Sequence, residues 1–98
     1  MNPSSTAILP EKQFMSDMRT KVRGYIIENF LFGQGNDLQD NTSFLEKGIL
    51  DSTGVLELVA FLEETFSIKI DAEETLPDNL DSIDLICAFL ERKLKAAA

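Results

Sequence analysis

The sequence predicts an all-α fold, a four-helix bundle with three main helices and one short helix, and three observations support this prediction. Apolar residues recur at helical spacing in three long segments. The 98 residues leave room for one domain and not for two. The only strand-like stretch, Ser67 to Ile70, is four residues long and lies between helical patterns. The chain is therefore expected to fold around one modest core between helices.

The first helix is expected from Glu11 to Phe32, preceded by Pro10, which suits the first turn of a helix. An apolar residue returns every fourth position along it, which gives one apolar stripe. Gly33 and Gly35 are expected to end the helix. The stripe consists of Phe14, Met18, Val22, Ile26 and Phe30.

A long polar loop is expected from Gln34 to Lys47, because this segment is rich in Asn, Asp, Thr and Ser, which favour turns. Phe44 and Leu45 are large apolar residues near its end. We expect both side chains to pin the loop to the core.

The second main helix is expected to start at Asp51 as its cap and to bury one stripe against the core. The stripe consists of Val55, Leu58, Val59, Leu62 and Phe66. The opposite face mixes carboxylates with small apolar groups, and it consists of Thr53, Glu57, Ala60 and Glu64, with Leu56 at its edge beside Glu63. A mixed face of this kind can dock a partner.

The last third of the chain predicts a short helical turn and a final helix. The turn is expected from Asp71 to Leu76, before Pro77. The final helix is expected to begin at Asp81, with Asp84 in capping-box spacing. Its stripe consists of Ile83, Ile86, Cys87, Leu90 and Leu94.

The domain is expected to span residues 10–95. Residues 1–9 are small and polar without a period, so we expect a flexible N-terminal arm, and 96–98 form a short tail.

The charge excludes several classes of partner. Nine basic and 17 acidic residues give a net charge of −8, so the positive surface that nucleic acid or an anionic membrane requires is missing. Residues 46–91 alone hold 12 acids and 2 bases. We expect protein partners with Lys- and Arg-rich surfaces.

The missing residue types exclude several kinds of chemistry. The chain has no His, which argues against Ser-His-Asp or Cys-His catalysis and against His-ligated metals. Cys87 is the single cysteine, so an internal disulfide is excluded, and its place on an apolar stripe predicts a buried thiol. The chain has no apolar run of signal-peptide or membrane-span length, so we expect a cytoplasmic protein. We also expect a monomer that is not itself an enzyme and binds no metal.

Ser52 is the candidate site for chemistry, because it follows Asp51 at the start of the second main helix. A helix start offers unpaired amides and a partial positive charge, which favour a phosphate there. The alternative is that Asp51 and Ser52 only cap the helix. Spacing does not decide between the two.

A longer pattern surrounds Ser52. The run S-T-G-V-L-E-L-V-A-F-L-E-E-T-F-S-I-K-I from Ser52 to Ile70 resembles the attachment serine and acidic second helix of acyl carrier proteins. The similarity extends upstream through F-L-E-K-G-I-L and downstream through L-D-S-I-D-L-I-C-A-F-L, so that it covers roughly residues 14–94. The resemblance implies the family's small four-helix fold.

The resemblance also implies a function. A phosphopantetheinyl transferase would attach 4′-phosphopantetheine from coenzyme A to Ser52, with Asp51 beside it, and the arm would carry cargo as a thioester. An acyl- or aminoacyl-loading ligase and acyltransferases or synthases would be further partners. Their docking face would consist of Thr53, Leu56, Glu57, Ala60, Glu63 and Glu64.

Two residues depart from the family's pattern. Thr53 stands where a larger apolar residue is common, and Gly54 stands where an acid is frequent. The resulting Asp-Ser-x-Gly run resembles D-alanyl carrier proteins and other specialised carriers, which leaves the cargo open.

Two alternatives remain on the sequence. Ser82 is a rival attachment site, because Leu80-Asp81-Ser82 repeats the run Leu50-Asp51-Ser52. A capping role fits Ser82 better, because the long acidic helix of the family pattern follows Ser52. The alternative function is an unmodified acidic interaction module with a carrier-like fold.

Overall fold

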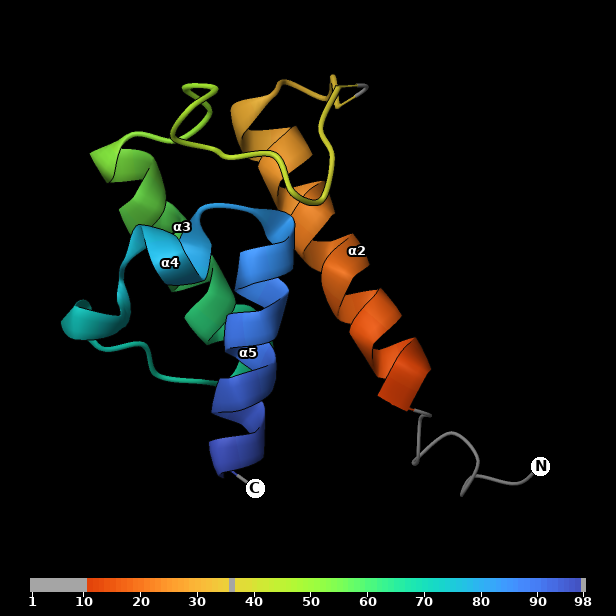
Figure 1. Ribbon diagram of the computed structural model, residues 1–98, viewed down its shortest axis with the longest axis vertical. Coiled ribbons are helices and arrows are strands. Elements are labelled where there is room, and N and C mark those ends of the chain that lie inside the picture. The colour runs from red at the N-terminus through yellow and green to blue at the C-terminus, as the bar shows by residue number, and fades with distance from the viewer. Residues whose placement is uncertain (1–10, 36, 98) are drawn as a thin grey trace.

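The computed structural model describes residues 11–35 and 37–97, and within them it shows helices and no strand (Figure 1). The arm 1–9 and Pro10 lie outside these described residues. The helices are α2 (Glu11–Phe30), α3 (Ser52–Phe66), α4 (Pro77–Leu80) and α5 (Ile83–Ala97), with a 3-10 turn at Ala72–Glu74 before α4. The predicted all-α bundle of three main helices and one short helix is confirmed.

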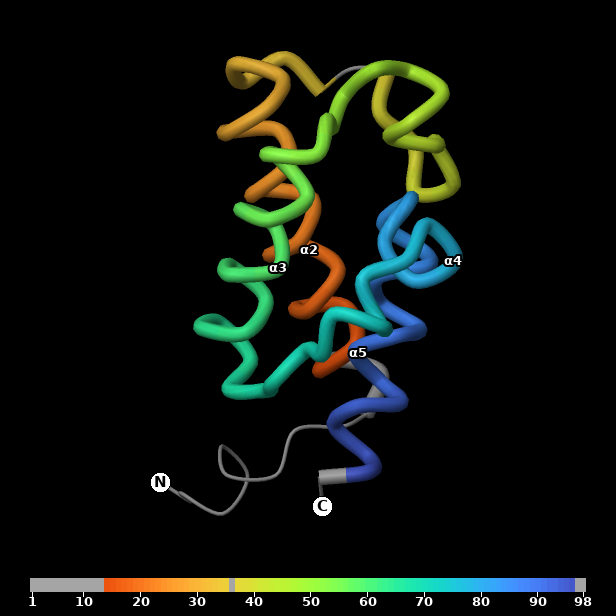
Figure 2. Tube along the Cα trace, turned by 90° about the vertical axis from the view of Figure 1, so that its left-hand side faces the viewer, coloured from red at the N-terminus to blue at the C-terminus, as the bar shows by residue number. Residues whose placement is uncertain are grey.

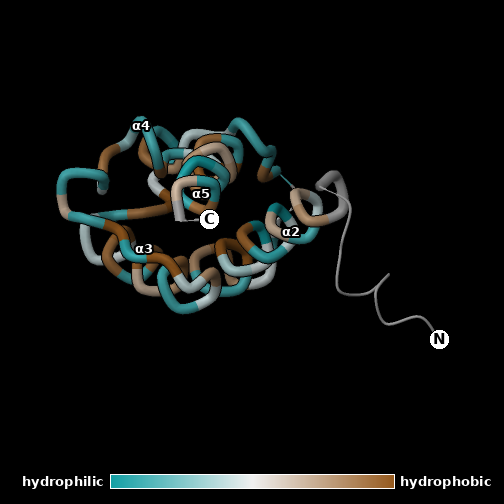
Figure 3. The backbone as a smooth tube through the Cα atoms, turned by 90° about the horizontal axis from the view of Figure 1, so that it is seen from below, coloured by the Kyte–Doolittle hydropathy of each residue, from teal (hydrophilic) through white to brown (hydrophobic). Residues whose placement is uncertain are grey.

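The helices enclose one core. α2 and α5 approach closely, as do α4 and α5. α2 and α3 lie along one side of the molecule and α4 and α5 along the other (Figures 2 and 3). The apolar segments face the space between the helices in Figure 3. Fully buried side chains come from every main helix and include Met18, Val22, Ile26, Leu58, Leu62, Ile83, Ile86 and Leu90. The predicted stripes therefore meet in a common interior.

The helix α3 has the predicted orientation. Leu58 and Leu62 are fully buried, and the other stripe members Val55, Val59 and Phe66 are partly buried against the core. In the first stripe, Phe14 departs from the expectation, because its side chain is 40% exposed.

The end of α2 differs from the prediction by two residues. The helix stops at Phe30, and the N–H groups of Leu31 and Gly33 both donate to the carbonyl of Ile27. Phe32 has a positive φ of 54° and Gly33 one of 80°, so the chain leaves the right-handed helix before Phe32.

The long loop is pinned by one of the two predicted side chains. Phe44 is fully buried, whereas Leu45 is 52% exposed, so the prediction was wrong for Leu45. The backbone explains the difference. Phe44 N–H donates to the carbonyl of Asp81 at 2.8 Å, and Leu45 N–H donates to the carboxylate of Asp81 at 2.9 Å. The turn held this way directs only the Phe44 ring inward.

The start of α5 also corrects the prediction. The capping side chain is Ser82, whose hydroxyl accepts from Leu85 N–H at 3.1 Å, and the helix begins at Ile83. The carboxylate of Asp81 instead accepts from the Ser43 hydroxyl at 2.5 Å. Asp81 therefore holds the loop rather than the helix.

The short helix begins at Pro77 and does not precede it. Pro77 is the first residue of α4, a position that suits proline because its missing N–H would be unpaired there anyway. The expected turn before Pro77 is only the 3-10 turn, closed by the side chain of Glu74, which accepts from Asp71 N–H at 2.9 Å.

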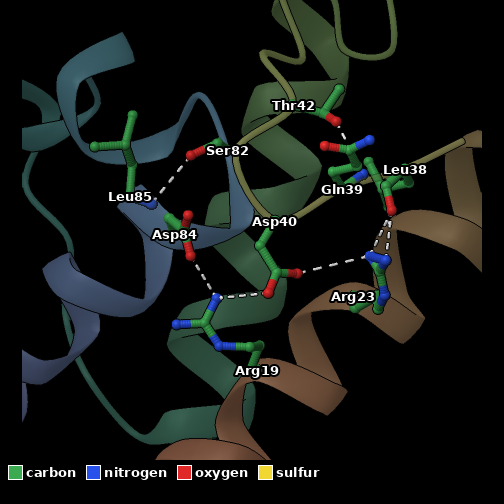
Figure 4. A network of polar contacts seen from close by, with 9 residues as sticks. All are labelled: Arg19, Arg23, Leu38, Gln39, Asp40, Thr42, Ser82, Asp84 and Leu85. Carbon is green, nitrogen blue, oxygen red and sulfur yellow. Dashed lines mark hydrogen bonds and ion pairs between the residues drawn. The ribbon is translucent and has the colours of Figure 1, made fainter.

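A network of charges fixes the middle of the loop to α2 and α5 (Figure 4). The guanidinium of Arg19 donates to Asp84 at 2.6 Å and to Asp40 at 3.1 Å, and Asp84 N–H donates to the Asp40 carbonyl at 2.9 Å. Arg23 donates to the carbonyl of Leu38. The loop that leads to Ser52 is thus attached at two places, through this network and through Asp81.

Candidate functional site

Ser52 is the first residue of α3 and is exposed to solvent. The capping role belongs to Asp51, whose Oδ1 accepts from Gly54 N–H at 2.7 Å, while its carbonyl accepts from Val55 N–H at 2.9 Å. Among the described residues, the Ser52 hydroxyl has no hydrogen-bond partner. The sequence left open whether Asp51 and Ser52 only cap the helix. Asp51 alone caps α3, and the exposed Ser52 hydroxyl is accessible for modification.

The amides at this helix start suit an anion. The N–H groups of Ser52 and Thr53 precede the first backbone hydrogen bond of α3, so they are open at the positive end of the helix dipole. The carboxylate of the cap Asp51 is engaged with Gly54 N–H, and no acidic residue lies in the first turn after it. A phosphate ester on Ser52 would find backbone N–H donors there.

Gly54 has a packing reason to be glycine. A Cβ atom at this position would lie 3.1 Å from Phe30 Cε1 and 3.1 Å from Leu50 Cδ2. The end of α2 therefore comes close to the first turn of α3, which fixes the backbone that presents Ser52.

The rival hydroxyl of Ser82 is in a different environment. Its residue is only 5% exposed, and its oxygen is engaged in capping α5. This burial supports Ser52 over Ser82 as the modifiable serine.

The thiol of Cys87 is also enclosed, as its position on the α5 stripe predicts. The residue is 1% exposed, and burial raises the pKa of the thiol above its usual value. A buried, protonated thiol is a poor nucleophile. Cys87 therefore offers no handle for a thioester.

The predicted docking residues share the exposed side of α3, with one exception. Thr53, Leu56, Glu57, Ala60 and Glu64 are all exposed. Glu63 is only partly exposed, and its carboxylate accepts from Ile70 N–H at 2.8 Å. It therefore stabilises the segment that follows α3.

A small apolar cavity of about 90 Å³ lies among α3, α4 and the loop. Its apolar lining includes Leu50 and Val55, which flank Ser52 in the chain, and Leu76 and Leu80 around α4. Leu76 was expected only to end the turn before Pro77 and not to line a cavity. The only signal in the sequence was an apolar residue next to Pro77, which does not reveal a cavity.

Within residues 11–35 and 37–97, no cluster of three or more Cys, Asp or Glu could hold a metal ion. In the same part of the chain, no helix is long and apolar enough to cross a membrane.

The fold and the site together define a small acidic helical domain of the carrier-protein class. The chain is 30% identical over 79 residues to the "Probable acyl carrier protein PigG" of Serratia sp. (strain ATCC 39006), a match that covers 81% of this chain and 90% of that protein. No model of a protein family matches the chain. On the match to that relative, the chain belongs to the acyl carrier protein family.

Proposed function

We propose that the protein carries acyl or aminoacyl groups as thioesters on a 4′-phosphopantetheine arm attached to Ser52. The observation that carries this proposal is the division of roles at the start of α3, where Asp51 caps the helix and the Ser52 hydroxyl remains exposed and unpaired among the described residues. The arm would supply a terminal thiol on a flexible linker, which the buried Cys87 cannot offer. The protein itself would be a substrate of enzymes rather than a catalyst.

The surroundings of Ser52 fit a phosphodiester. The Asp51 carboxylate is engaged with Gly54 N–H, so the N–H groups of Ser52 and Thr53 remain as donors toward the phosphate. The close contact of Gly54 with Phe30 holds this turn in place. The residues present would thus bind and orient the phosphate at the helix start.

The exposed side of α3 is the proposed docking face for the transferase, a loading ligase and acyltransferases or synthases. It comprises Thr53, Leu56, Glu57, Ala60 and Glu64, with Glu63 at its edge. Basic partner surfaces would be attracted by the net charge of −8, with rates that fall as salt rises. Such charge pairs contribute about 0–1 kcal/mol each, which favours brief encounters. The protein would act as a monomer.

The small apolar cavity lined by Leu50 and Val55 favours small cargo. Its volume of about 90 Å³ is below the roughly 150 Å³ that holds one benzene molecule. A long acyl chain would therefore extend outside the bundle. The Asp-Ser-x-Gly run points in the same direction, toward aminoacyl or other specialised groups.

Loading of Ser52 tests the function directly. The purified protein is incubated with coenzyme A, Mg²⁺ and a permissive phosphopantetheinyl transferase, and the intact mass is measured. We expect one phosphopantetheine adduct on the wild-type chain, no adduct on Ser52→Ala and an adduct on Ser82→Ala. A thiol reagent should react fast with one group after loading and with none before, since Cys87 is buried.

Circular dichroism of each variant confirms that an absent adduct does not reflect unfolding. A folded wild-type chain that stays unmodified under these conditions would indicate the alternative, an acidic interaction module that keeps the carrier fold. An adduct that persists in Ser52→Ala would show that the phosphopantetheine is attached to another residue.

The same reaction tests the docking face. We expect Glu57→Lys to slow transferase loading several-fold at low salt, because it places a positive charge where a basic partner would approach. Glu73→Lys changes the net charge equally at an exposed position in the 3-10 turn and should load at nearly the wild-type rate. Equal rates for both variants would remove the docking role of α3.

A further inference from the structure

A shallow groove runs between α2 and α3 on the side of the bundle away from α5. Its volume is about 300 Å³, and its surface is mostly apolar. Tyr25 and Phe61 form its floor, with their rings stacked at a centroid distance of 4.0 Å and an interplanar angle of 12°. Figure 3 shows α2 and α3 side by side there, with α4 and α5 on the opposite side of the molecule. The groove has room for a large apolar side chain.

Gly24 lies in the wall of this groove, in the middle of α2. It lies about 200° around the helix from both Val22 and Ile26, which are fully buried, so it faces away from the core. Apart from its chain neighbours and the backbone of its own helix, no described atom lies within 4 Å of a Cβ atom built at Gly24. Glycine weakens a helix relative to alanine, and no internal packing accounts for it here. The open space beside the backbone allows another chain to approach closely.

The rim of the groove is mainly acidic. Glu28 lines it on α2, and Glu57 and Glu64 lie within one turn of Phe61 on α3. The charge of Glu57 reaches the groove floor, because burial and then Glu57 raise the pKa of Tyr25. Lys21 is the basic residue in the described lining. The field over the groove thus attracts cations.

We propose that the groove between α2 and α3 binds an amphipathic, basic helix of a partner protein. An apolar side chain of that helix would rest on the rings of Tyr25 and Phe61, its backbone would pass close to Gly24, and its Lys or Arg residues would meet the acidic rim. A second copy of this chain is disfavoured as the occupant, because two molecules of charge −8 repel each other. The proposal goes beyond the carrier function, since it does not require a modified Ser52.

The chain contains a built-in reporter for this test. Tyr25 is the only tyrosine and there is no tryptophan, so tyrosine fluorescence reports on the groove alone. The probe is a synthetic helical peptide with a leucine stripe flanked by lysines and without aromatic residues. We expect saturable changes in Tyr25 fluorescence, and amide shifts in ¹⁵N spectra centred on Gly24, Tyr25 and Phe61.

The variant Gly24→Leu should weaken peptide binding at least about tenfold, because the added side chain fills the groove. Ser16→Leu adds the same side chain at another exposed position of α2 and should bind as the wild type does. Glu28→Gln should weaken binding and lessen its salt dependence, whereas Glu73→Gln should not. Gly24→Leu should still accept phosphopantetheine on Ser52, which separates this proposal from the carrier function.

Three results would overturn the proposal. In the first, the peptide shifts only amides of the docking face, such as those of Thr53 and Leu56. In the second, Gly24→Leu binds the peptide as tightly as Ser16→Leu does. In the third, sedimentation shows the wild-type chain self-associating through the groove, with dimers lost in Gly24→Leu, and the occupant is then a second copy.

Discussion

Replacing Phe44 with alanine should lower the free energy of unfolding by about 3–5 kcal/mol, the largest loss we expect from a single truncation in this chain. The ring is fully buried and belongs to the loop that leads to Ser52. Its removal takes away apolar burial and leaves a cavity next to the space of about 90 Å³ that the ring already borders. Urea denaturation followed by circular dichroism measures the loss.

The adjacent residue provides the matched control. Leu45→Ala removes a side chain that is 52% exposed, so the loss should stay below about 1 kcal/mol. Similar losses for Phe44→Ala and Leu45→Ala would mean that the loop is not anchored by one ring. The comparison is direct, because neither substitution removes a backbone N–H group that donates to Asp81.

Leu62→Ala should destabilise the fold by about 2–5 kcal/mol, because Leu62 is fully buried on the inner side of α3. Leu56→Ala removes the same side chain from the same helix at a position that is 68% exposed. That variant should change the free energy of unfolding by no more than about 0.5 kcal/mol. Thermal or urea unfolding of the two variants gives both losses in the free energy of unfolding, and their difference shows which side of α3 faces the core.

The comparison of the losses in Leu62→Ala and Leu56→Ala tests which side of α3 is buried. If Leu62→Ala cost less than Leu56→Ala, α3 would be turned around its axis, and Glu57 and Glu64 would not belong to an exposed face. The docking proposal would then fail together with the packing of the helix.

Local patterns were sufficient to predict the main helices. Apolar spacing identified the buried faces of α2, α3 and α5, because a helix buries one stripe and the stripe repeats with the helical period. The same reasoning placed Cys87 in the core, and the capping position of Asp51 placed Ser52 at the start of α3. These features depend on residues a few positions apart, which a sequence displays directly.

The roles of individual polar groups depended on distant residues. Asp81 looked like the cap of the last helix, but Ser43 and Leu45, 38 and 36 residues earlier, offer its carboxylate a hydroxyl and an amide. The capping role then fell to Ser82. A carboxylate accepts from whichever donors the fold brings near, so spacing alone could not assign this partner.

The groove and the cavity were equally hidden in the sequence. Gly24 looked like any glycine inside a helix, and only the neighbouring helix shows that open space lies beside it. Leu76 gained its place in the cavity lining, with Leu50 and Val55, through the position of α4.

By itself, then, the sequence determined the helical class, the buried stripes, the acidic character and the serine that stands at a helix start. Tertiary structure alone decided which hydroxyl is free, which carboxylates hold the loop and where the surface is hollow. The physical reason is that helix periodicity is a property of neighbouring residues. Hydrogen-bond partners and empty space are set by segments that meet only after the chain has folded.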